Sequence, residues 1–448
     1  MIKSKLSLST THLLLLSFVV AILIGTGLLC LPISSANGQA TPFIDALFTA
    51  TTSTCVTGLT TVTTVAHWSL FGQIVILILI QIGGLGVITA LAGITAFVYK
   101  KLGLANRFLL QDTMNITTMS GIVPFLKRVI MGTFAIEAIG ALLYAFVFVK
   151  DFGLKGIWIS VFTSVSAFCN AGIDIIADNS LVNYATNPIV NFTTCFLIVL
   201  GGLGYIVWWD VLGLFKNKNK NYKSLSLHSK IVLSSTFVLI FVGAVLFFIF
   251  EYNNPLTMQN LSLFDKVQAS FFQSVTTRTA GFFTLPQENL TNASSVVSLL
   301  LMFIGGSPAG TAGGVKTVTM VVVFVSALAT IQNKQDTNLF DRKISKDIIR
   351  KSIAVVSVSF AIAFLSTLLL SIASNANFLD IIYETVSATA TVGLSRSLTP
   401  TLNVFGKIIV ICTMYLGRVG PISMAIAFNV KRENKNIIKN PKEDICVG

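Results

Sequence analysis

Four short polar segments, each ending in glycine, are the residues of this sequence whose types and spacing could do chemistry. We refer to them as the filter segments, and they are Val56-Thr57-Gly58, Asn170-Ala171-Gly172, Thr279-Ala280-Gly281 and Thr391-Val392-Gly393. Their glycines are spaced by 114, 109 and 112 residues, which indicates an internal repeat. Glycine permits dihedrals that turn successive carbonyls toward one axis, where they can replace the hydration shell of a cation. The predicted chemistry is therefore ion coordination by backbone oxygens.

A mildly amphipathic stretch precedes each filter segment and is too short to cross a membrane. The four stretches lie at 43–54, 156–168, 264–277 and 378–389. A half-helix that enters from outside points its partially negative C-terminal end toward the membrane centre, where it favours a cation. Non-helical backbone is tolerated at that depth only where protein buries it or where it lines a watery cavity. The four filter segments are therefore expected to meet around one pore.

The rest of the chain has the composition of a membrane protein. Of its 448 residues, 54% are hydrophobic and 11% are charged, against roughly 25% charged in typical globular domains. The mean hydropathy is +0.81, so a soluble enzyme is excluded. Spans of about 20 apolar residues mark transmembrane helices. We expect eight, at roughly 11–32, 69–99, 124–149, 188–215, 228–251, 295–330, 348–373 and 402–430.

One half-helix lies between the two members of each successive pair of spans. The expected fold is therefore an all-α integral membrane protein of four helix–pore-loop–helix repeats, arranged pseudo-fourfold around one ion pore. The expected boundaries are 1–100 for repeat 1, 101–222 for repeat 2, 223–333 for repeat 3, 334–430 for repeat 4 and 431–448 for a cytoplasmic tail.

Basic residues gather on one side of this eight-helix arrangement. The 31 lysines and arginines exceed the 18 acidic residues and give a net charge of +13. Of these 31, 23 lie in segments that fall on the same side, namely the N-terminus, 100–128, 216–230, 334–351 and the tail. Because basic loops mark the cytoplasmic side, both termini are expected to be cytoplasmic. Topology accounts for the basic excess, which therefore does not imply a nucleic-acid partner. The apolar composition predicts contact with membrane lipid.

The sixth span contains a stretch that cannot remain α-helical. Five glycines and a proline occur in ten residues, in the order Gly305, Gly306, Ser307, Pro308, Ala309, Gly310, Thr311, Ala312, Gly313 and Gly314. We expect an unwound loop folded into the membrane below the filter segments, with a passive kink as the alternative. A nucleotide-binding P-loop is excluded, because Val315 precedes Lys316 where that motif has glycine.

Arg418 lies about twelve residues inside the cytoplasmic end of the last span, which is too deep for its charge to reach the surface. A charge at that depth must be paired or face water. Our hypothesis is that Arg418 lies in the pore near the 305–314 loop, bonds free carbonyls of the loop and repels cations until the loop moves. A structural pair with a neighbouring residue is the alternative.

Four further charged residues are expected to have structural roles. Arg278 follows the third half-helix and is expected to point behind the filter segments and brace them, with Glu384 as a candidate partner. Asp45, Asp265 and Asp380 lie near the starts of half-helices, where carboxylates cap free N–H groups. Capping is expected for these three rather than ion binding.

On these motifs the chain resembles the Trk/Ktr/HKT superfamily of potassium transporters, and in particular the bacterial KtrB-type membrane subunits. The resemblance covers nearly the whole chain. Thr391-Val392-Gly393 is also similar to the core of potassium-channel filters, although Leu394 stands where those channels have tyrosine. In the superfamily, glycine in all four filters goes with potassium, whereas serine in the first goes with sodium. The resemblance therefore implies K+ as the transported ion.

The resemblance also implies a setting for the pore. It implies that the 305–314 loop is an intramembrane gate, and that the protein is a homodimer in the bacterial cell membrane with one pore per subunit. A cytoplasmic ring of KtrA-like RCK proteins is the implied regulatory partner. Because the chain has no dinucleotide-binding fingerprint, any nucleotide is expected only on that partner. Na+ is an additional candidate activator.

Three classes of function are compared at this point: a potassium-selective, channel-like transporter, a sodium-dependent secondary transporter with broken helices at midplane, and an intramembrane enzyme. The six cysteines and three histidines show no CxxC or metal-ligand spacing, so no catalytic residues are predicted. Many secondary transporters are built from inverted repeats, whereas all four half-helices here enter from one side. The channel-like reading is therefore favoured.

Overall fold

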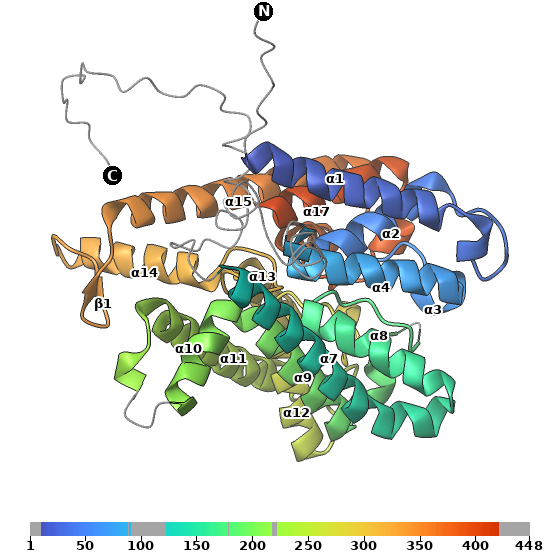
Figure 1. Cartoon of the computed structure of the whole chain (residues 1–448), viewed down its shortest axis with the longest axis horizontal. Coiled ribbons are helices and arrows are strands. Elements are labelled where there is room, and N and C mark those ends of the chain that lie inside the picture. Colours follow the sequence, from blue (N-terminus) through green and yellow to red (C-terminus); the bar gives the residue numbers. More distant parts are fainter. Residues whose placement is uncertain (1–9, 88, 91–121, 178, 217–221, 421–448) are drawn as a thin grey trace, which may run out of the picture.

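Within the described residues the regular elements are helices, apart from one short hairpin. The computed structural model describes residues 10–87, 89–90, 122–177, 179–216 and 222–420. A long helix, a short helix and a further helical span follow one another four times (Figure 1). We call these groups repeats 1 to 4. The hairpin pairs β1 (Asn338–Leu339) with β2 (Arg342–Lys343) in antiparallel register.

The first helix of each repeat is long and apolar enough to cross a membrane. These helices are α1 (Thr10–Leu29), α7 (Ile122–Phe152), α11 (Leu227–Glu251) and α15 (Lys346–Ala373). They turn large apolar side chains outward, since Phe241 of α11 is 60% exposed and Phe360 of α15 is 65% exposed. An outer surface of this kind fits lipid rather than water, so these four predicted spans are confirmed.

The short helices begin and end within one residue of the predicted half-helices. They are α2 (Phe43–Cys55), α8 (Lys155–Cys169), α12 (Leu263–Thr276) and α16 (Phe378–Ala390). Their hydroxyl groups are turned inward, and α2 fully buries Thr51, Thr52, Ser53 and Thr54 in succession. The short helices therefore bring polar groups into the interior of a molecule whose outer surface is apolar, as a membrane-embedded pore requires.

The predicted single helix at 188–215 is wrong. Two helices occupy this span, α9 (Pro188–Leu203) and α10 (Tyr205–Lys216), and they are bent by 99° at Gly204. Gly204 has a φ of 87°, a conformation that a residue without a Cβ adopts at little cost. An apolar pattern that continues on both sides of the bend concealed it in the sequence.

The second spans of repeats 1 and 4 end in the same way. Their helices are α4 (Leu70–Leu85) and α17 (Val404–Val419). Each stops before a glycine of positive φ, Gly86 at 84° and Gly420 at 93°. The predicted continuations over 91–99 and 421–430 lie outside the described residues. In repeat 3 the second span is divided into α13 (Asn292–Phe303) and α14 (Thr317–Ile331), with non-helical backbone between them.

The repeats form a closed ring. In each case the second span of one repeat packs against the short helix of the next: α4 on α8, α9 on α12, α13 on α16, and α17 on α2. The last contact joins repeat 4 to repeat 1, and Figure 1 shows the red α17 beside the blue α1. Single-turn helices lie in the connections, namely α3 (Thr64–His67), η1 (Pro32–Ser34), η2 (Val182–Tyr184), η3 (Tyr222–Ser224), η4 (Gln287–Asn289) and η5 (Thr399–Thr401).

Candidate ion pore

The four filter segments share one backbone conformation. The residue two positions before each glycine has a left-handed φ, at Val56 (55°), Asn170 (58°), Thr279 (67°) and Thr391 (50°). The glycines also have positive φ, between 63° and 101°, whereas the residue between does not. Left-handed backbone is uncommon for non-glycine residues, above all for a β-branched one such as Val56. It persists where the surrounding structure imposes it, so the fold holds all four segments in the same alternating conformation.

The filter glycines meet in a ring that closes on itself. Each faces the carbonyl oxygen that precedes the glycine of the next repeat: Gly58 faces Ala171, Gly172 faces Ala280, Gly281 faces Val392 and Gly393 faces Thr57. A methyl group added at Gly58 would lie 2.5 Å from the oxygen of Ala171, a distance that real Cβ atoms do not adopt. Glycine is therefore required by close approach between repeats as well as by its positive φ.

The amide groups of the filter segments point back to the short helices. The N–H of Thr57 donates to the carbonyl of Thr52 at 2.8 Å, and the N–H of Gly58 donates to the hydroxyl of Thr52 at 2.9 Å. The middle residues of the other segments repeat the backbone bond: Ala171 to Ser166, Ala280 to Thr276 and Val392 to Ser387. The amides of the four middle residues are thus occupied, while their carbonyl oxygens face the filter glycine of the neighbouring repeat.

Side chains of the filter segments add buried polar atoms without protein partners. Among the described residues, Thr57 Oγ1, Thr391 Oγ1 and both polar side-chain atoms of Asn170 make no hydrogen bond. Buried polar groups are normally bonded, so these atoms are available to an ion or to water. The described part of the chain contains no cluster of three or more His, Cys, Asp or Glu residues. Coordination at this site would therefore rest on oxygens of backbone and hydroxyl groups.

An acidic residue follows the second filter segment. Asp174 lies two residues after Gly172, in the loop between α8 and α9. Its Oδ1 accepts a hydrogen bond from the N–H of Ile176 at 3.3 Å. Burial raises the pKa of Asp174 to about 6, and hydrogen bonds from the backbone act in the opposite direction. The carboxylate is therefore charged at neutral pH and loses its charge in mild acid.

A second set of glycines presses against the ends of the short helices. An added Cβ would clash with the carbonyl of Thr54 at Gly83, of Phe168 at Gly201 and of Thr389 at Gly417. Gly305 holds the matching place in repeat 3 but faces Gly313 of the 305–314 loop. The second spans thus pack directly onto the backbone that leads into the filter segments, and any side chain at these positions would push the two apart.

The 305–314 loop is fastened to repeat 2. Ser307 N–H donates to the carbonyl of Gly202 at 2.9 Å, and Thr311 N–H donates to that of Gly201 at 3.0 Å. In return, Tyr205 N–H donates to the carbonyl of Ala309 at 3.0 Å. The bend at Gly204 exposes the backbone that makes these bonds. The bend between α9 and α10, which the sequence analysis did not predict, therefore provides the backbone groups that bind the loop.

The same loop lies directly behind two filter segments. Gly313 N–H donates to the hydroxyl of Thr279 at 3.1 Å, and a Cβ added at Gly313 would clash with the hydroxyl of Thr391. The side chain of Thr311 donates to the carbonyl of Phe168 at 3.0 Å. Movement of the loop cannot occur without changing contacts to the filter segments of repeats 3 and 4.

Two cationic side chains also bond carbonyls of the loop. Arg418 donates from Nη1 to the carbonyl of Thr311 at 2.7 Å and from Nη2 to the carbonyl of Gly83 at 2.5 Å. Lys316 Nζ donates to the carbonyl of Ala312 at 2.6 Å. The structure therefore places Arg418 against the loop, as our hypothesis requires. It also brings in Lys316, to which the sequence analysis gave no role in the pore.

The predicted partner of Arg278 is wrong. Its Nη2 lies 3.4 Å from the hydroxyl of Thr236 in α11, and Glu384 instead accepts from the hydroxyls of Ser395 and Thr399. Arg278 is 6% exposed and faces the helix behind its filter segment. Bracing of the filter segments by Arg278 stays a prediction. The partner was predicted wrongly because distance along the sequence does not show which acid already has donors.

Capping by the three aspartates is also wrong. Asp45 and Asp380 lie in the first turns of α2 and α16, where they form ion pairs with Lys407 at 2.6 Å and with Arg396 at 2.8 Å. At α12 the cap is Ser262, whose hydroxyl accepts from the N–H of Asp265 and donates to its carboxylate. Arg396, in the loop after the fourth filter segment, and Lys407, in α17, bind the two carboxylates in place of the helix N–H groups. The sequence pattern could not show these partners.

Comparison with known proteins agrees with this geometry. A family model described as "Cation transport protein", TrkH, matches residues 9–440. The Ktr system potassium uptake protein B of Bacillus subtilis is 41% identical over 438 residues, covering 98% of this chain and 96% of that protein. The potassium/sodium uptake protein NtpJ of Enterococcus hirae is 37% identical over 447 residues, covering 98% of both. These relatives are transporters and not enzymes.

A solved structure has the same fold. The crystal structure of the potassium transporter TrkH from Vibrio parahaemolyticus superposes with a TM-score of 0.75 at 16% identity, covering 95% of this chain and 86% of that one. The predicted fold class, an all-helical multi-pass membrane protein with four helix–pore-loop–helix repeats around one pore, is thereby confirmed. Because the family model matches residues 9–440, which is nearly the whole chain, the chain belongs to the TrkH family of cation transport proteins.

Proposed function

We propose that this protein takes up potassium across the cell membrane through a channel-like pore that selects ions with backbone carbonyls. The closed ring of filter glycines is the observation that carries the proposal. Four carbonyl oxygens, those of Thr57, Ala171, Ala280 and Val392, lie in this ring next to the glycine of the adjoining repeat. Rings of backbone carbonyls replace the hydration shell of K+ in selective pores. The filter residues are those of the four filter segments.

The names of the relatives support potassium as the ion. The Bacillus subtilis protein is named for potassium uptake and the Enterococcus hirae protein for potassium and sodium uptake. The second name supports an alternative, a sodium-dependent coupled transporter, and also sodium as an activator. The ring of filter glycines favours the channel-like potassium pore, because four parallel segments around one axis form a continuous pore rather than a site exposed alternately to the two sides of the membrane.

The 305–314 loop is the proposed gate, with Arg418 as its latch. The loop lies behind the filter segments and is held by backbone bonds to repeat 2 and by Arg418. Arg418 is the only arginine of α17 and places positive charge beside the loop, where it repels cations. Opening would break the bond from Arg418 to Thr311 and move the loop aside.

The setting of the pore is part of the same proposal. Both termini of the chain are cytoplasmic, and repeats 1 to 4 end at residues 100, 222, 333 and 430. Two copies form a homodimer, and a KtrA-like RCK ring docks on the basic cytoplasmic face. Any nucleotide binds to that ring. Regulation by a separate subunit is supported by the name of the Bacillus subtilis relative, which is one component of a Ktr system.

Labelled rubidium uptake in cells without their own potassium uptake tests the proposed function. The comparison is between the wild type, Gly58→Ser and the matched control Gly27→Ser. Gly27 of α1 has nothing within 4 Å of an added Cβ, whereas Gly58 faces the oxygen of Ala171. Wild type and Gly27→Ser should take up rubidium in the presence of excess sodium, and Gly58→Ser should lose that discrimination. Rubidium uptake in the wild type that requires a sodium gradient would favour the coupled transporter.

A further inference from the structure

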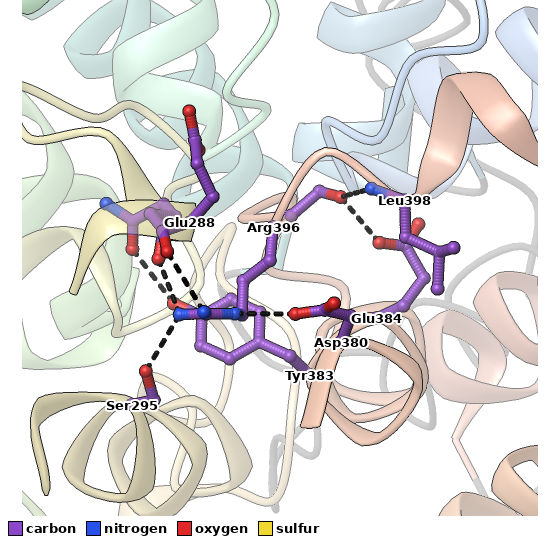
Figure 2. Close-up of polar contacts among 9 residues, drawn as sticks. Glu288, Ser295, Asp380, Tyr383, Glu384, Arg396 and Leu398 are labelled. Carbon is purple, nitrogen blue, oxygen red and sulfur yellow. Dashed lines mark hydrogen bonds and ion pairs between the residues drawn. The ribbon is translucent and has the colours of Figure 1, made fainter. Parts of the chain in front are cut away.

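Arg396 lies at the outer contact between repeats 3 and 4, three residues after Gly393. Its guanidinium makes four bonds: Nε to Asp380 Oδ1 at 2.8 Å, Nη1 to the carbonyl of Gln287 at 2.8 Å and to Ser295 Oγ at 3.0 Å, and Nη2 to the carbonyl of Glu288 at 3.0 Å. Figure 2 shows the planar group between Asp380 on one side and Glu288 and Ser295 on the other. We call these five residues the Arg396 cluster.

The cluster connects two polypeptide segments that belong to different repeats. Asp380 belongs to α16 of repeat 4, whereas Gln287 and Glu288 lie in η4 and Ser295 belongs to α13, all in repeat 3. Only 11% of the Arg396 side chain and 22% of the Asp380 side chain are exposed. Water therefore screens this pair less than it screens a surface ion pair. Three of the four bonds cross from repeat 4 to repeat 3.

Gln287 extends the cluster to both short helices. Its Oε1 accepts from Gln273 of α12 and from the hydroxyl of Tyr383 of α16, each at 2.8 Å. All three side chains are fully buried. The η4 turn that receives Arg396 is therefore fixed to the helix that leads into the third filter segment and to the helix that leads into the fourth.

The segment after the fourth filter is pinned on its other side by Glu384 of α16. Its carboxylate accepts from Ser395 Oγ at 2.6 Å and from Thr399 Oγ1 at 2.5 Å. Ser395 and Thr399 flank Arg396, and Figure 2 shows Glu384 and Asp380 at the same side of the cluster. The chain that leaves Gly393 is thus held to its own short helix by two carboxylates and to the neighbouring repeat by one guanidinium.

We propose that Arg396 is a positioning residue that sets the spacing between the third and fourth filter segments and so determines how strongly the pore prefers potassium over sodium. The inference rests on the proposed function. Gly281 and Val392 are in close contact across this boundary, since a Cβ at Gly281 would lie 2.6 Å from the oxygen of Val392. A small displacement of the segment that follows Gly393 changes where this oxygen lies.

Arginine suits this role because its planar guanidinium presents donors in fixed directions to several acceptors at once. Lysine would keep the charge beside Asp380 but could not reach the carbonyls of Gln287 and Glu288 in the same geometry. Glutamine would remove both the charge and most of the donors. The two substitutions therefore separate a positioning role from a purely electrostatic role at the outer mouth.

The test is the ratio of potassium to sodium flux through the purified full-length protein in liposomes. Arg396→Lys and Arg396→Gln should each lower this ratio several-fold while total cation flux continues. Lys343→Gln is the control: it removes the exposed ion pair between Lys343 of β2 and Asp336, which precedes β1, and should leave the ratio unchanged. Ser295→Ala removes one bond of the cluster, and a smaller decrease is expected. This variant gives the decision if the Arg396 variants do not fold.

Each outcome decides something different. The inference would be overturned if both Arg396 variants kept wild-type selectivity, or if Ser295→Ala did so when the Arg396 variants do not fold. The proposed function would stand in either case. If Arg396→Gln lost selectivity and Arg396→Lys kept the wild-type ratio, Arg396 would act through its positive charge at the outer mouth of the pore. This result would also overturn the inference. A wild-type protein that conducts without preferring potassium would instead contradict the proposed function on which the inference rests.

Discussion

Arg418 and Thr311 lie 107 residues apart in the chain, and the Arg418 guanidinium donates to the carbonyl oxygen of Thr311 at 2.7 Å. This bond joins the last helix of the ring to the non-helical loop of repeat 3. A second bond of the same side chain goes to the carbonyl of Gly83 in repeat 1. One side chain therefore links repeats 1, 3 and 4.

Replacing Arg418 tests whether the loop is latched in this way. Arg418→Ala removes both bonds and the positive charge, so rubidium uptake without a regulatory ring should rise several-fold. Arg418→Lys keeps the charge but not the paired bonds, and an intermediate rate is expected. If both variants had wild-type uptake rates at equal membrane levels, Arg418 would have only a structural role and would not hold the loop closed.

The close approach of second spans to short helices predicts a difference between two glycines. Gly417→Ala should destabilise the protein by about 1–3 kcal/mol, because its Cβ would clash with the carbonyl of Thr389 in a packed interior. Gly213 of α10 has nothing within 4 Å of an added Cβ. Gly213→Ala should therefore be neutral or stabilise its helix by up to about 1 kcal/mol.

Thermal unfolding of the two purified variants in detergent checks this difference. A lower midpoint for Gly417→Ala with an unchanged or higher midpoint for Gly213→Ala is the expected pattern. Equal midpoints would mean that α17 can move away from the fourth short helix at no cost, and the packing explanation of the second glycines would then fail.

Asp174 predicts a dependence of uptake on external pH. With a pKa of about 6, the carboxylate is charged above pH 6 and neutral below it. Negative charge near a pore mouth raises the local cation concentration, so potassium uptake should increase as external pH rises from 5 to 7. Asp174→Asn removes the titrating group, and initial uptake rates measured at low potassium should then lose this step. A pH profile that the variant leaves unchanged would assign the titration to another group.

The short helices and the filter segments could be predicted from the sequence for a physical reason. An amphipathic stretch too short to cross, followed by polar residues and glycine, has few alternatives in a membrane. For this reason 378–389 was predicted within one residue of the α16 helix, Phe378–Ala390. The fourfold recurrence of this pattern was sufficient to predict a ring around one axis.

Other features could not be read from the sequence. The bend at Gly204 lies within a continuous apolar stretch, where hydropathy does not change across the break. A signal was present in Gly-Gly-Leu-Gly, which occurs at both 83–86 and 201–204. The partners of Asp45 and Arg278 depend on which donors the ring brings together over hundreds of residues, and no local pattern carries that information.

The central claim is that backbone carbonyls of the four filter segments bind the transported ion. An anomalous diffraction map of crystals grown in rubidium chloride tests it most directly. The account predicts rubidium on the axis of the ring, bounded by the carbonyls of Thr57, Ala171, Ala280 and Val392. Rubidium bound only by carboxylates elsewhere, with an empty ring, would contradict it.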